Sequence, residues 1–434
     1  MAAAQTQQVN SQQANMMARN AILASAKDMW LPIYNTLPVG AIPGQVINVP
    51  LRNVGLIKRL LIEITGTVNL IDSGAGGAST MNLTEFGFAN LLSNVQLTDL
   101  NNQQRINTTG WHLHFLASAR RQAAFGAAYY SSDMRINSAA NGVLAVLAVG
   151  PDGLSTSVTG QGAAFGVNYG DVRVLSAAAP GTTRPFRFFY EIPVAYGDYD
   201  LRGAIYANVV NATMNLQFTF NPTPFTNGPL APAGGSVDTT NAIYAVTRAG
   251  TWVSNTLAVT GLTVYQNFLD QLPMTQNGPV LPLMDLSHAY MLQMTAFGGL
   301  TAGQDYPLPY ANFRQFLSTT IVIDDSTATT FLSGVGGIPG TNVNFFALET
   351  ANFTNLFRVD PFTAKLWERE IINNELPRGT YYFDSRRQPV ITTQQGNTQL
   401  IVNLNAAGAT SQILAGWEML ALIGQVTQAG SLPG

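Results

Sequence analysis

The sequence Val49-Pro50-Leu51-Arg52-Asn53-Val54-Gly55 aligns with Leu281-Pro282-Leu283-Met284-Asp285-Leu286-Ser287. An alternation of apolar and polar residues follows both stretches and stays in phase through residues 66 and 298. A period of two is typical of a strand that buries one face. One such match between apolar strands arises easily by chance, so the interpretation depends on whether further matches follow in the same order.

Further matches do follow in the same order. Phe88-Ala89-Asn90, before a strand pattern at 95–99, aligns with Tyr310-Ala311-Asn312, before one at 321–324. Each half then predicts a helix, two strands and a last strand with a tryptophan. In the first half these are residues 110–124, 187–194, 214–220 and 252–265, and in the second 361–374, 380–383, 399–404 and 417–423.

The repeat predicts an all-β fold of two tandem eight-stranded jelly-roll β-sandwiches, a double jelly roll, with a few short helices. The predicted units are a first jelly roll at 44–267, a linker at 268–278, a second jelly roll at 279–426 and a tail at 427–434. Residues 127–182 are rich in Ala, Gly, Ser and Val and are interpreted as a long loop insertion in the first roll.

Residues 1–43 are predicted to form an N-terminal helical arm, because Gln and Ala dominate the segment up to about Trp30 and proline is absent before Pro32. We expect the helix to continue to about Trp30. One arc of the helical wheel then holds Met16, Leu23 and Trp30, with Arg19 inside the arc and Lys27 at its edge. Two interpretations stay open: a helix packed on its own domain, or an arm that lies on a partner or a lipid surface.

The composition excludes several classes of protein. Only 45 of the 434 residues are charged, the formal net charge is -3, and cysteine is absent. Disordered chains are richer in charge and poorer in aromatic residues, and a dedicated nucleic-acid binder needs a basic surface. Without cysteine there are no thiolate zinc sites and no disulfides. The N-terminus lacks the features of a secretion signal, and asparagine and proline interrupt the longest uncharged run, which argues against a membrane-spanning helix.

No group of residues predicts catalysis or metal binding. His112 and His114 lie in a predicted helix, where their side chains point about 200° apart and cannot share an ion. The close acid pairs, Asp198 with Asp200 and Asp324 with Asp325, flank turns, where aspartate serves local hydrogen bonds. Phosphate-binding loops and nucleophile motifs are absent from the sequence. We therefore expect no enzyme, no cofactor and no metal.

Several motifs, in order from about residue 50 to 390, resemble the double jelly-roll major capsid proteins of tectiviruses, which are icosahedral bacteriophages with an internal membrane. They are Gly110-Trp111-His112-Leu113-His114-Phe115, Asp200-Leu201-Arg202-Gly203-Ala204, Ala207-Asn208-Val209, Leu269-Asp270-Gln271-Leu272-Pro273, Gln276-Asn277-Gly278, Asp285-Leu286-Ser287, Tyr310-Ala311-Asn312, Thr350-Ala351-Asn352-Phe353 and Tyr381-Tyr382.

The resemblance implies a major capsid protein whose homotrimers are pseudo-hexagonal capsomers of six similar rolls in an icosahedral shell. It implies that the arm lies at the capsid base, facing neighbouring capsomers and the internal membrane, with Met16, Arg19, Leu23, Lys27 and Trp30 as the partner-facing residues. The implied partners are further copies of the chain, virion proteins at the vertices and lipid, with no specific nucleic acid. The implied location is the virion, after assembly in the host cytoplasm.

The runner-up hypothesis is a glycan-binding jelly-roll module or a viral receptor-binding protein. The aromatic side chains of Tyr129, Tyr130, Phe165 and Tyr169 would then serve as sugar platforms. A carbohydrate-active enzyme is a third class, and it would need two carboxylates that converge in a cleft.

Overall fold

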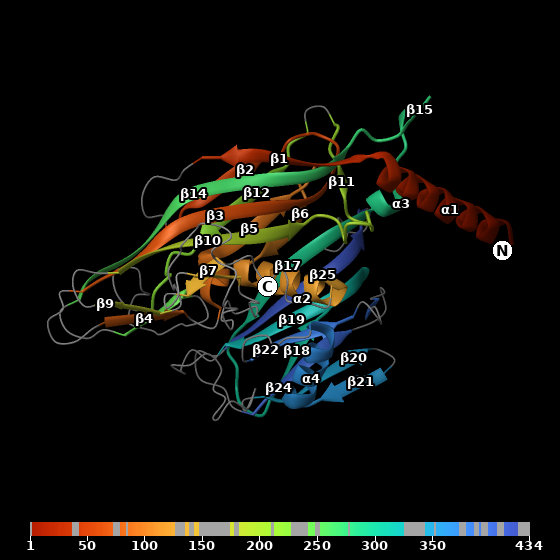
Figure 1. Ribbon diagram of the computed structural model, residues 1–434. Helices are drawn as coiled ribbons and strands as arrows, with labels where there is room; N and C mark the ends of the chain where they lie inside the picture. The colour runs from red at the N-terminus through yellow and green to blue at the C-terminus, as the bar shows by residue number, and fades with distance from the viewer. Residues whose placement is uncertain are drawn as a thin grey trace.

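The structure is a computed structural model dominated by β-strands (Figure 1). It describes residues 2–36, 43–72, 79–83, 86–125, 135–138, 143–146, 174–177, 182–209, 212–226, 242–247, 252–276, 278–324, 343–350, 353–372, 379–385, 390–391, 398–405 and 412–423. Two bodies of sheet lie one above the other in this view, and the N-terminal helix α1 (Ala2–Ser25) projects from the upper one.

The first body is a jelly roll of two packed sheets. One sheet has the strand order β1-β14-β3-β10 and the other contains β2-β12-β5-β6. The eight strands are β1 (Lys27–Asn35), β2 (Val46–Pro50), β3 (Leu56–Asp72), β5 (Leu92–Thr98), β6 (Gln104–Thr108), β10 (Thr182–Pro193), β12 (Asn215–Phe220) and β14 (Trp252–Asp270).

The second body repeats this topology with the orders β17-β25-β19-β22 and β18-β24-β20-β21. In both bodies the first, eighth, third and sixth strands form one sheet, and the second, seventh, fourth and fifth form the other. The predicted double jelly roll is therefore confirmed. The strands are β17 (His288–Phe297), β18 (Asp305–Pro309), β19 (Arg314–Asp324), β20 (Val343–Thr350), β21 (Phe353–Val359), β22 (Thr380–Asp384), β24 (Gln399–Leu404) and β25 (Gln412–Leu422).

The early part of the repeat alignment is wrong about which strands correspond. It matched β3 with β17, but β3 is the third strand of its roll and β17 is the first. It also matched β5, a fourth strand, with β19, a third strand. Every half-buried strand has the same apolar period, so the period alone cannot tell one strand from another. From the helices onward the matched strands do correspond, including the last strands β14 and β25.

The cause of the shift is the first strand, β1, which lies within the predicted helical arm. Helix α1 ends at Ser25, so the expectation that the helix continues to Trp30 is wrong. Residues Lys27–Asn35 pair antiparallel with β14, starting with Lys27 opposite Asp270. Met29, Trp30 and Leu31 are compatible with either a helix or a strand, and the free edge of β14 decides between them.

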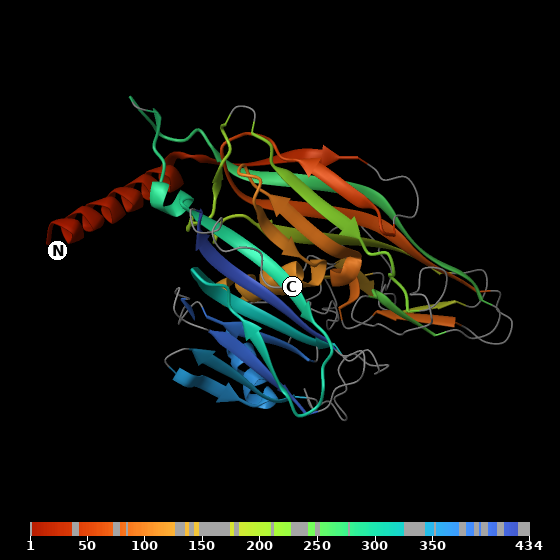
Figure 2. The same cartoon turned by 180° about the vertical axis from the view of Figure 1, so that it is seen from behind.

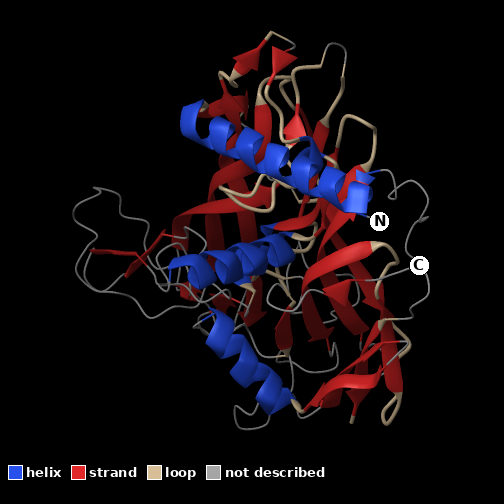
Figure 3. Ribbon diagram, turned by 90° about the vertical axis from the view of Figure 1, so that its right-hand side faces the viewer, coloured by secondary structure: helices blue, strands red, loops and turns tan. Residues whose placement is uncertain are grey.

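The two predicted long helices are confirmed, and each follows the fifth strand of its roll. They are α2 (Gly110–Phe125) and α4 (Pro361–Ile372). The backbone N–H of Thr363 donates a 2.7 Å hydrogen bond to Asp360 Oδ1, so Asp360 caps α4. Figure 3 shows α1, α2 and α4 one above another along one side of the molecule.

Smaller elements complete the described part of the chain. Strands β4, β9 and β13 make a separate sheet at the far end of β3 and β14, on the left in Figure 1. The predicted insertion 127–182 contains β7, β8 and β9. The bounds are η1 (Gly87–Leu91), α3 (Leu283–Leu286), β4 (Ser79–Leu83), β7 (Arg135–Ser138), β8 (Val143–Val146), β9 (Val174–Ala177), β11 (Ile205–Tyr206), β13 (Tyr244–Thr247), β15 (Met274–Thr275), β16 (Gly278–Pro279) and β23 (Val390–Ile391).

The two rolls are joined through β6 and β17, which run parallel. Ile106 lies opposite Leu292, and Asn107 lies opposite Gln293. This pairing merges one sheet from each roll into a nine-stranded sheet, which Figure 2 shows from behind. The buried apolar residues of both rolls also form one continuous core. The rolls therefore form one packed unit.

Helix α2 of the first roll packs directly on β25 of the second roll. The ring of His112 lies so close to Gly416 that a Cβ atom there would be 2.6 Å from His112 Nε2. Glycine inside a strand commonly marks a place where another group must approach the backbone. The contact holds the helix of one roll against a strand of the other.

Replacing Gly416 with alanine should lower the free energy of unfolding by about 1–3 kcal/mol, because the added methyl group would overlap the buried His112 ring. Urea denaturation measures the change. Gly298→Ala is the matched control, since a Cβ atom at Gly298 meets nothing within 4 Å. Equal stability of the two variants would contradict the tight contact between the rolls.

The His112 side chain is fully buried, with its Nδ1 atom 2.7 Å from the hydroxyl of Thr108. Burial lowers the pKa of His112 to about 4, and the nearby Glu418 carboxylate acts in the opposite direction but more weakly. Glu418 is also fully buried and accepts hydrogen bonds from the Tyr290 hydroxyl (3.0 Å) and the Ser318 hydroxyl (2.6 Å). The contact between the rolls thus contains a histidine that stays neutral in the folded chain.

The free energy of unfolding should fall as the pH drops from about 6.5 to about 4. In this range His112 takes up a proton in the unfolded chain but stays neutral in the folded chain. The pKa difference corresponds to about 3 kcal/mol, present above pH 6.5 and lost by pH 4. Urea denaturation at a series of pH values measures the slope. The His112→Gln variant should lose this part of the slope, while His288→Gln should keep it. An unchanged slope in His112→Gln would exclude His112 as its source.

Candidate assembly surface

Helix α1 contacts the rolls through its C-terminal end, and its N-terminal end reaches beyond the body of the molecule (Figure 1). Ile22 is fully buried in a small second apolar cluster, and Leu23 packs against the same cluster. The other buried members are Leu56, Ala195, Leu201, Ala204 and Leu269. These contacts come from the first roll and fix where the helix leaves it.

A buried carboxylate fixes the direction of α1. Asp285 of α3 accepts a 2.9 Å hydrogen bond from Asn15 Nδ2, and Arg19 lies 3.6 Å from its other oxygen. Asn15 Oδ1 in turn accepts from the backbone N–H of Met284 at 2.9 Å. Asp285 is almost completely buried, so its negative charge needs these partners. The helix of the first roll is thereby tied to the start of the second.

The five predicted partner-facing residues do not share one surface. Met16 is exposed on α1, whereas Arg19 and Leu23 serve the contact between α1 and the rolls. Lys27 and Trp30 lie on β1, where the guanidinium of Arg59 sits 5.3 Å from the centre of the Trp30 ring.

Sequence reasoning missed the carboxylate contact of α1. Asp285 lies 270 residues from Asn15, and in the repeat it aligned with an ordinary loop position, Asn53. No local pattern identifies such a pair.

Two apolar surfaces are exposed at opposite ends of the molecule. One is the edge strand β1, with Met29, Trp30 and Leu31. The other is the outer face of α4, with Phe362, Leu366 and Trp367. Helix α4 is the reverse of an ordinary surface helix, because Lys365 and Glu368 are buried and bonded to each other at 3.0 Å. Exposed apolar groups of this extent are typical of interaction sites.

The polar groups that suggested chemistry have structural partners. Asp200 forms a salt bridge with Arg202 (2.7 Å) and Asp198 one with Arg59 (3.1 Å), while Asp325 lies outside the described residues. His112 and His114 are both buried in α2. Among the described residues, no three His, Asp or Glu side chains are grouped closely enough to hold a metal ion. No helix in the described part of the chain has the length and hydropathy needed to cross a membrane.

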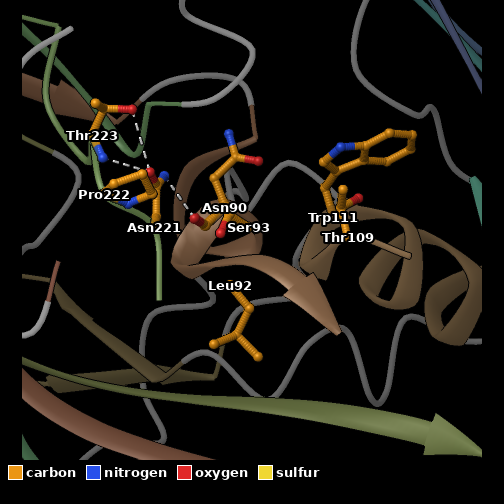
Figure 4. A pocket seen from close by; sticks show the side chains of 8 residues that line it. All are labelled: Asn90, Leu92, Ser93, Thr109, Trp111, Asn221, Pro222 and Thr223. Atoms are coloured by element: carbon orange, nitrogen blue, oxygen red, sulfur yellow. Dashed lines mark hydrogen bonds between the residues drawn. The ribbon is translucent and has the colours of Figure 1, made fainter. Parts of the chain in front are cut away.

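A cavity of about 260 Å³ lies between the end of η1, which contains Asn90, and the start of α2 (Figure 4). The polar side chains at one end of it are used within the chain. Asn221 Nδ2 donates to the carbonyl of Asn90 at 2.9 Å, and the backbone N–H of Thr223 donates to Asn221 Oδ1 at 2.8 Å. These amides hold the loops together, and they supply no argument for a ligand.

The family of the P3 major capsid protein matches the chain in two parts. Its N-terminal domain matches residues 1–272, and its C-terminal domain matches residues 287–433. The chain belongs to the P3 major capsid protein family. It is 31% identical over 443 residues to the major capsid protein P3 of Enterobacteria phage PRD1, and the match covers 99% of both chains.

Solved structures agree on the fold. The crystal structure of the STIV MCP has a TM-score of 0.57 at 11% identity, with 94% of this chain and 100% of that chain covered. The atomic structure of Sulfolobus Turreted Icosahedral Virus contains a chain with a TM-score of 0.53 at 11% identity, with 93% and 94% covered. The P3 family consists of structural capsid proteins, and its members are not enzymes.

Replacing Asp285 with asparagine should loosen α1, because the charge that attracts Arg19 is removed. Trypsin cleavage after Arg19 should become about fivefold faster, which corresponds to about 1 kcal/mol for the ion pair. Mass spectrometry of the fragments over time gives the rate. Asp360→Asn, which alters the cap of α4, is the control and should leave that rate unchanged. Equal rates in both variants would show that Asp285 does not hold the helix.

Proposed function

We propose that three copies of this chain form a pseudo-hexagonal capsomer, and that these capsomers build an icosahedral shell around an internal membrane. The observation that carries the proposal is the presence in one chain of two rolls with identical strand order, side by side in a common sheet. Three such chains place six similar rolls around one axis. A threefold oligomer can then fill a position with nearly sixfold surroundings.

The proposal divides the chain as the sequence suggested, with one change. The two rolls remain the units, the connection near residues 268–278 joins them, and residues 427–434 form a tail. The first roll begins at β1 instead of residue 44, because β1 is its first strand. The arm is therefore helix α1 alone.

We assign α1 to the base of the capsid, where it reaches neighbouring capsomers and lipid. Its exposed face carries Met16 and Met17, which suit contact with apolar surface. Arg19 and Leu23 set the position of the helix, and Lys27 and Trp30 belong to the edge of the first roll. Minor proteins at the vertices and assembly in the host cytoplasm complete the proposal, on family resemblance, with no specific nucleic acid as partner.

The alternative of glycan or receptor binding gains no support from the described residues. Tyr129, Tyr130, Phe165 and Tyr169 lie outside them, so their arrangement carries no argument.

The purified chain should have three times its monomer mass by light scattering at micromolar concentration. A stable monomer would contradict the proposed capsomer.

Deleting residues 2–14 tests the role of the arm and spares Asn15, Arg19 and Ile22, which hold α1 to the rolls. We expect trimers of normal mass, because the contacts of Asn15, Arg19 and Ile22 with the rolls remain. Electron microscopy should show few closed shells, and flotation in a density gradient should show reduced retention of lipid. Met17→Ala is a milder change and should lie between the deletion and the unaltered chain. Normal shells with normal lipid from the deletion would contradict the proposed arm contact.

A further inference from the structure

The junction between the two rolls pairs one edge strand of the first roll with one edge strand of the second. It places β6, the fifth strand of the first roll, beside β17, the first strand of the second roll. The strands with the same ranks in the other roll are β21 and β1. In the described part of the chain each of them ends its sheet, with β20 as the partner of β21 and β14 as the partner of β1. They lie at opposite ends of the molecule, β1 at the top and β21 at the bottom of Figure 1.

Strands β1 and β17 occupy equivalent positions, and their burial differs. Each pairs with the last strand of its roll from its first residue, Lys27 opposite Asp270 and His288 opposite Leu422. The third to fifth residues are apolar in both strands. In β17 these residues are Tyr290, Met291 and Leu292, and they are 0%, 4% and 0% exposed. In β1 they are Met29, Trp30 and Leu31, and they are 44%, 44% and 36% exposed.

The other half of the junction shows the same contrast. Strand β6 ends two residues before α2 begins, and β21 ends two residues before α4 begins. The two strands also differ in the residue that lies fourth from the strand end. In β6 it is Arg105, which is almost fully buried and bonded to Asp99 at 2.6 Å, whereas in β21 it is the apolar Leu356, which is 52% exposed. Helix α2 is buried from Trp111 to Leu116, in part by the second roll, while α4 exposes Phe362, Leu366 and Trp367. The exposed apolar side chains of β1, β21 and α4 thus occupy positions whose counterparts in β17, β6 and α2 are buried at the internal junction.

We infer that β21 and α4 of one copy dock on β1 of the next copy, in the arrangement that β6 and α2 make with β17 inside the chain. This inference rests on the proposed trimer and specifies its interface. Two different surfaces then meet at each contact, and a head-to-tail contact of this kind closes into a ring when the rotation fits. Three internal junctions and three junctions between copies alternate around the capsomer.

The internal register predicts which residues meet. Ile106 lies opposite Leu292 and Asn107 opposite Gln293. Ile106 and Phe357 are each third from the end of their strand, and Leu292 and Leu31 are each fifth from the start of theirs. Phe357 should therefore lie opposite Leu31 of the next copy, and Arg358 opposite its Pro32. Since proline has no N–H to donate, side-chain packing should contribute more to this contact than backbone hydrogen bonds. The buried Lys365–Glu368 pair fits this arrangement, because it keeps two charged side chains away from Phe362, Leu366 and Trp367, although Glu370 is exposed further along the helix.

A cysteine pair tests the register directly, because the natural sequence contains no cysteine. We would combine Pro32→Cys with Arg358→Cys, two exposed positions, and oxidise the purified protein. Opposed residues on neighbouring strands are close enough for a disulfide. Non-reducing electrophoresis should show dimer and trimer bands with no longer ladder, and reduction should remove them. Each single variant, and the control pair Tyr199→Cys with Arg358→Cys, should give no trimer band.

Light scattering and cross-linking together distinguish a failure of the inference from a failure of the proposed function. A trimer by light scattering without cross-linking would overturn the inference and leave the proposed capsomer standing. A monomer in the unaltered chain would overturn both.

A second variant, Leu31→Glu, should raise the monomer–trimer dissociation constant at least tenfold while circular dichroism shows normal folding, since Leu31 is exposed in the single chain. Met274→Glu, at another exposed apolar position, should leave the constant unchanged. An unchanged constant in Leu31→Glu would also overturn the inference.

Discussion

The parallel pairing of β6 with β17 is the contact on which the rest of the structure depends. It involves only two opposed residue pairs, yet it merges sheets from both rolls, and α2 reinforces it by placing the neutral His112 ring against Gly416. A short ladder alone would let the rolls rotate against each other. The continuous core and the buried Glu418 network beside His112 remove that freedom. Because the pairing uses β6 and β17, it leaves their counterparts, β21 and β1, at the ends of their sheets in the described part of the chain.

The distribution of apolar and charged residues follows from this geometry. A chain with 10% charged residues would be unusual if its whole surface faced water, and the exposed side chains of β1 and α4 show where much of the apolar surface lies. Helix α4 turns its one lysine inward onto Glu368 and presents phenylalanine, leucine and tryptophan outward. Such a helix is costly in an isolated chain and favourable when a neighbour covers it. Low charge and inverted amphipathicity thus have a common explanation in self-association.

The sequence predicted the fold class and the helices near residues 110–124 and 361–374, because both depend on local patterns or on the order of several patterns. It predicted neither the end of α1 nor strand β1. The residues from Lys27 to Leu31 suit both conformations, and the decision comes from β14, more than 200 residues away. The contact of Asp285 with Asn15 and Arg19 was not predicted for a similar reason, because Asp285 lies 270 residues from Asn15 in the sequence. The repeat matched the wrong strands of the two rolls where the alternation of apolar residues was the only evidence. It matched the right strands after the helix of each roll, because the helix marks a position in the order.

An electron cryomicroscopy reconstruction of the trimer, at a resolution that separates strands, would show directly whether the junction inside the chain is repeated between chains. We expect β21 of each copy to lie parallel to β1 of the next, with Phe362 and Leu366 of α4 covered by that neighbour. A trimer in which β1 and α4 face solvent, with the copies joined through other surfaces, would contradict it.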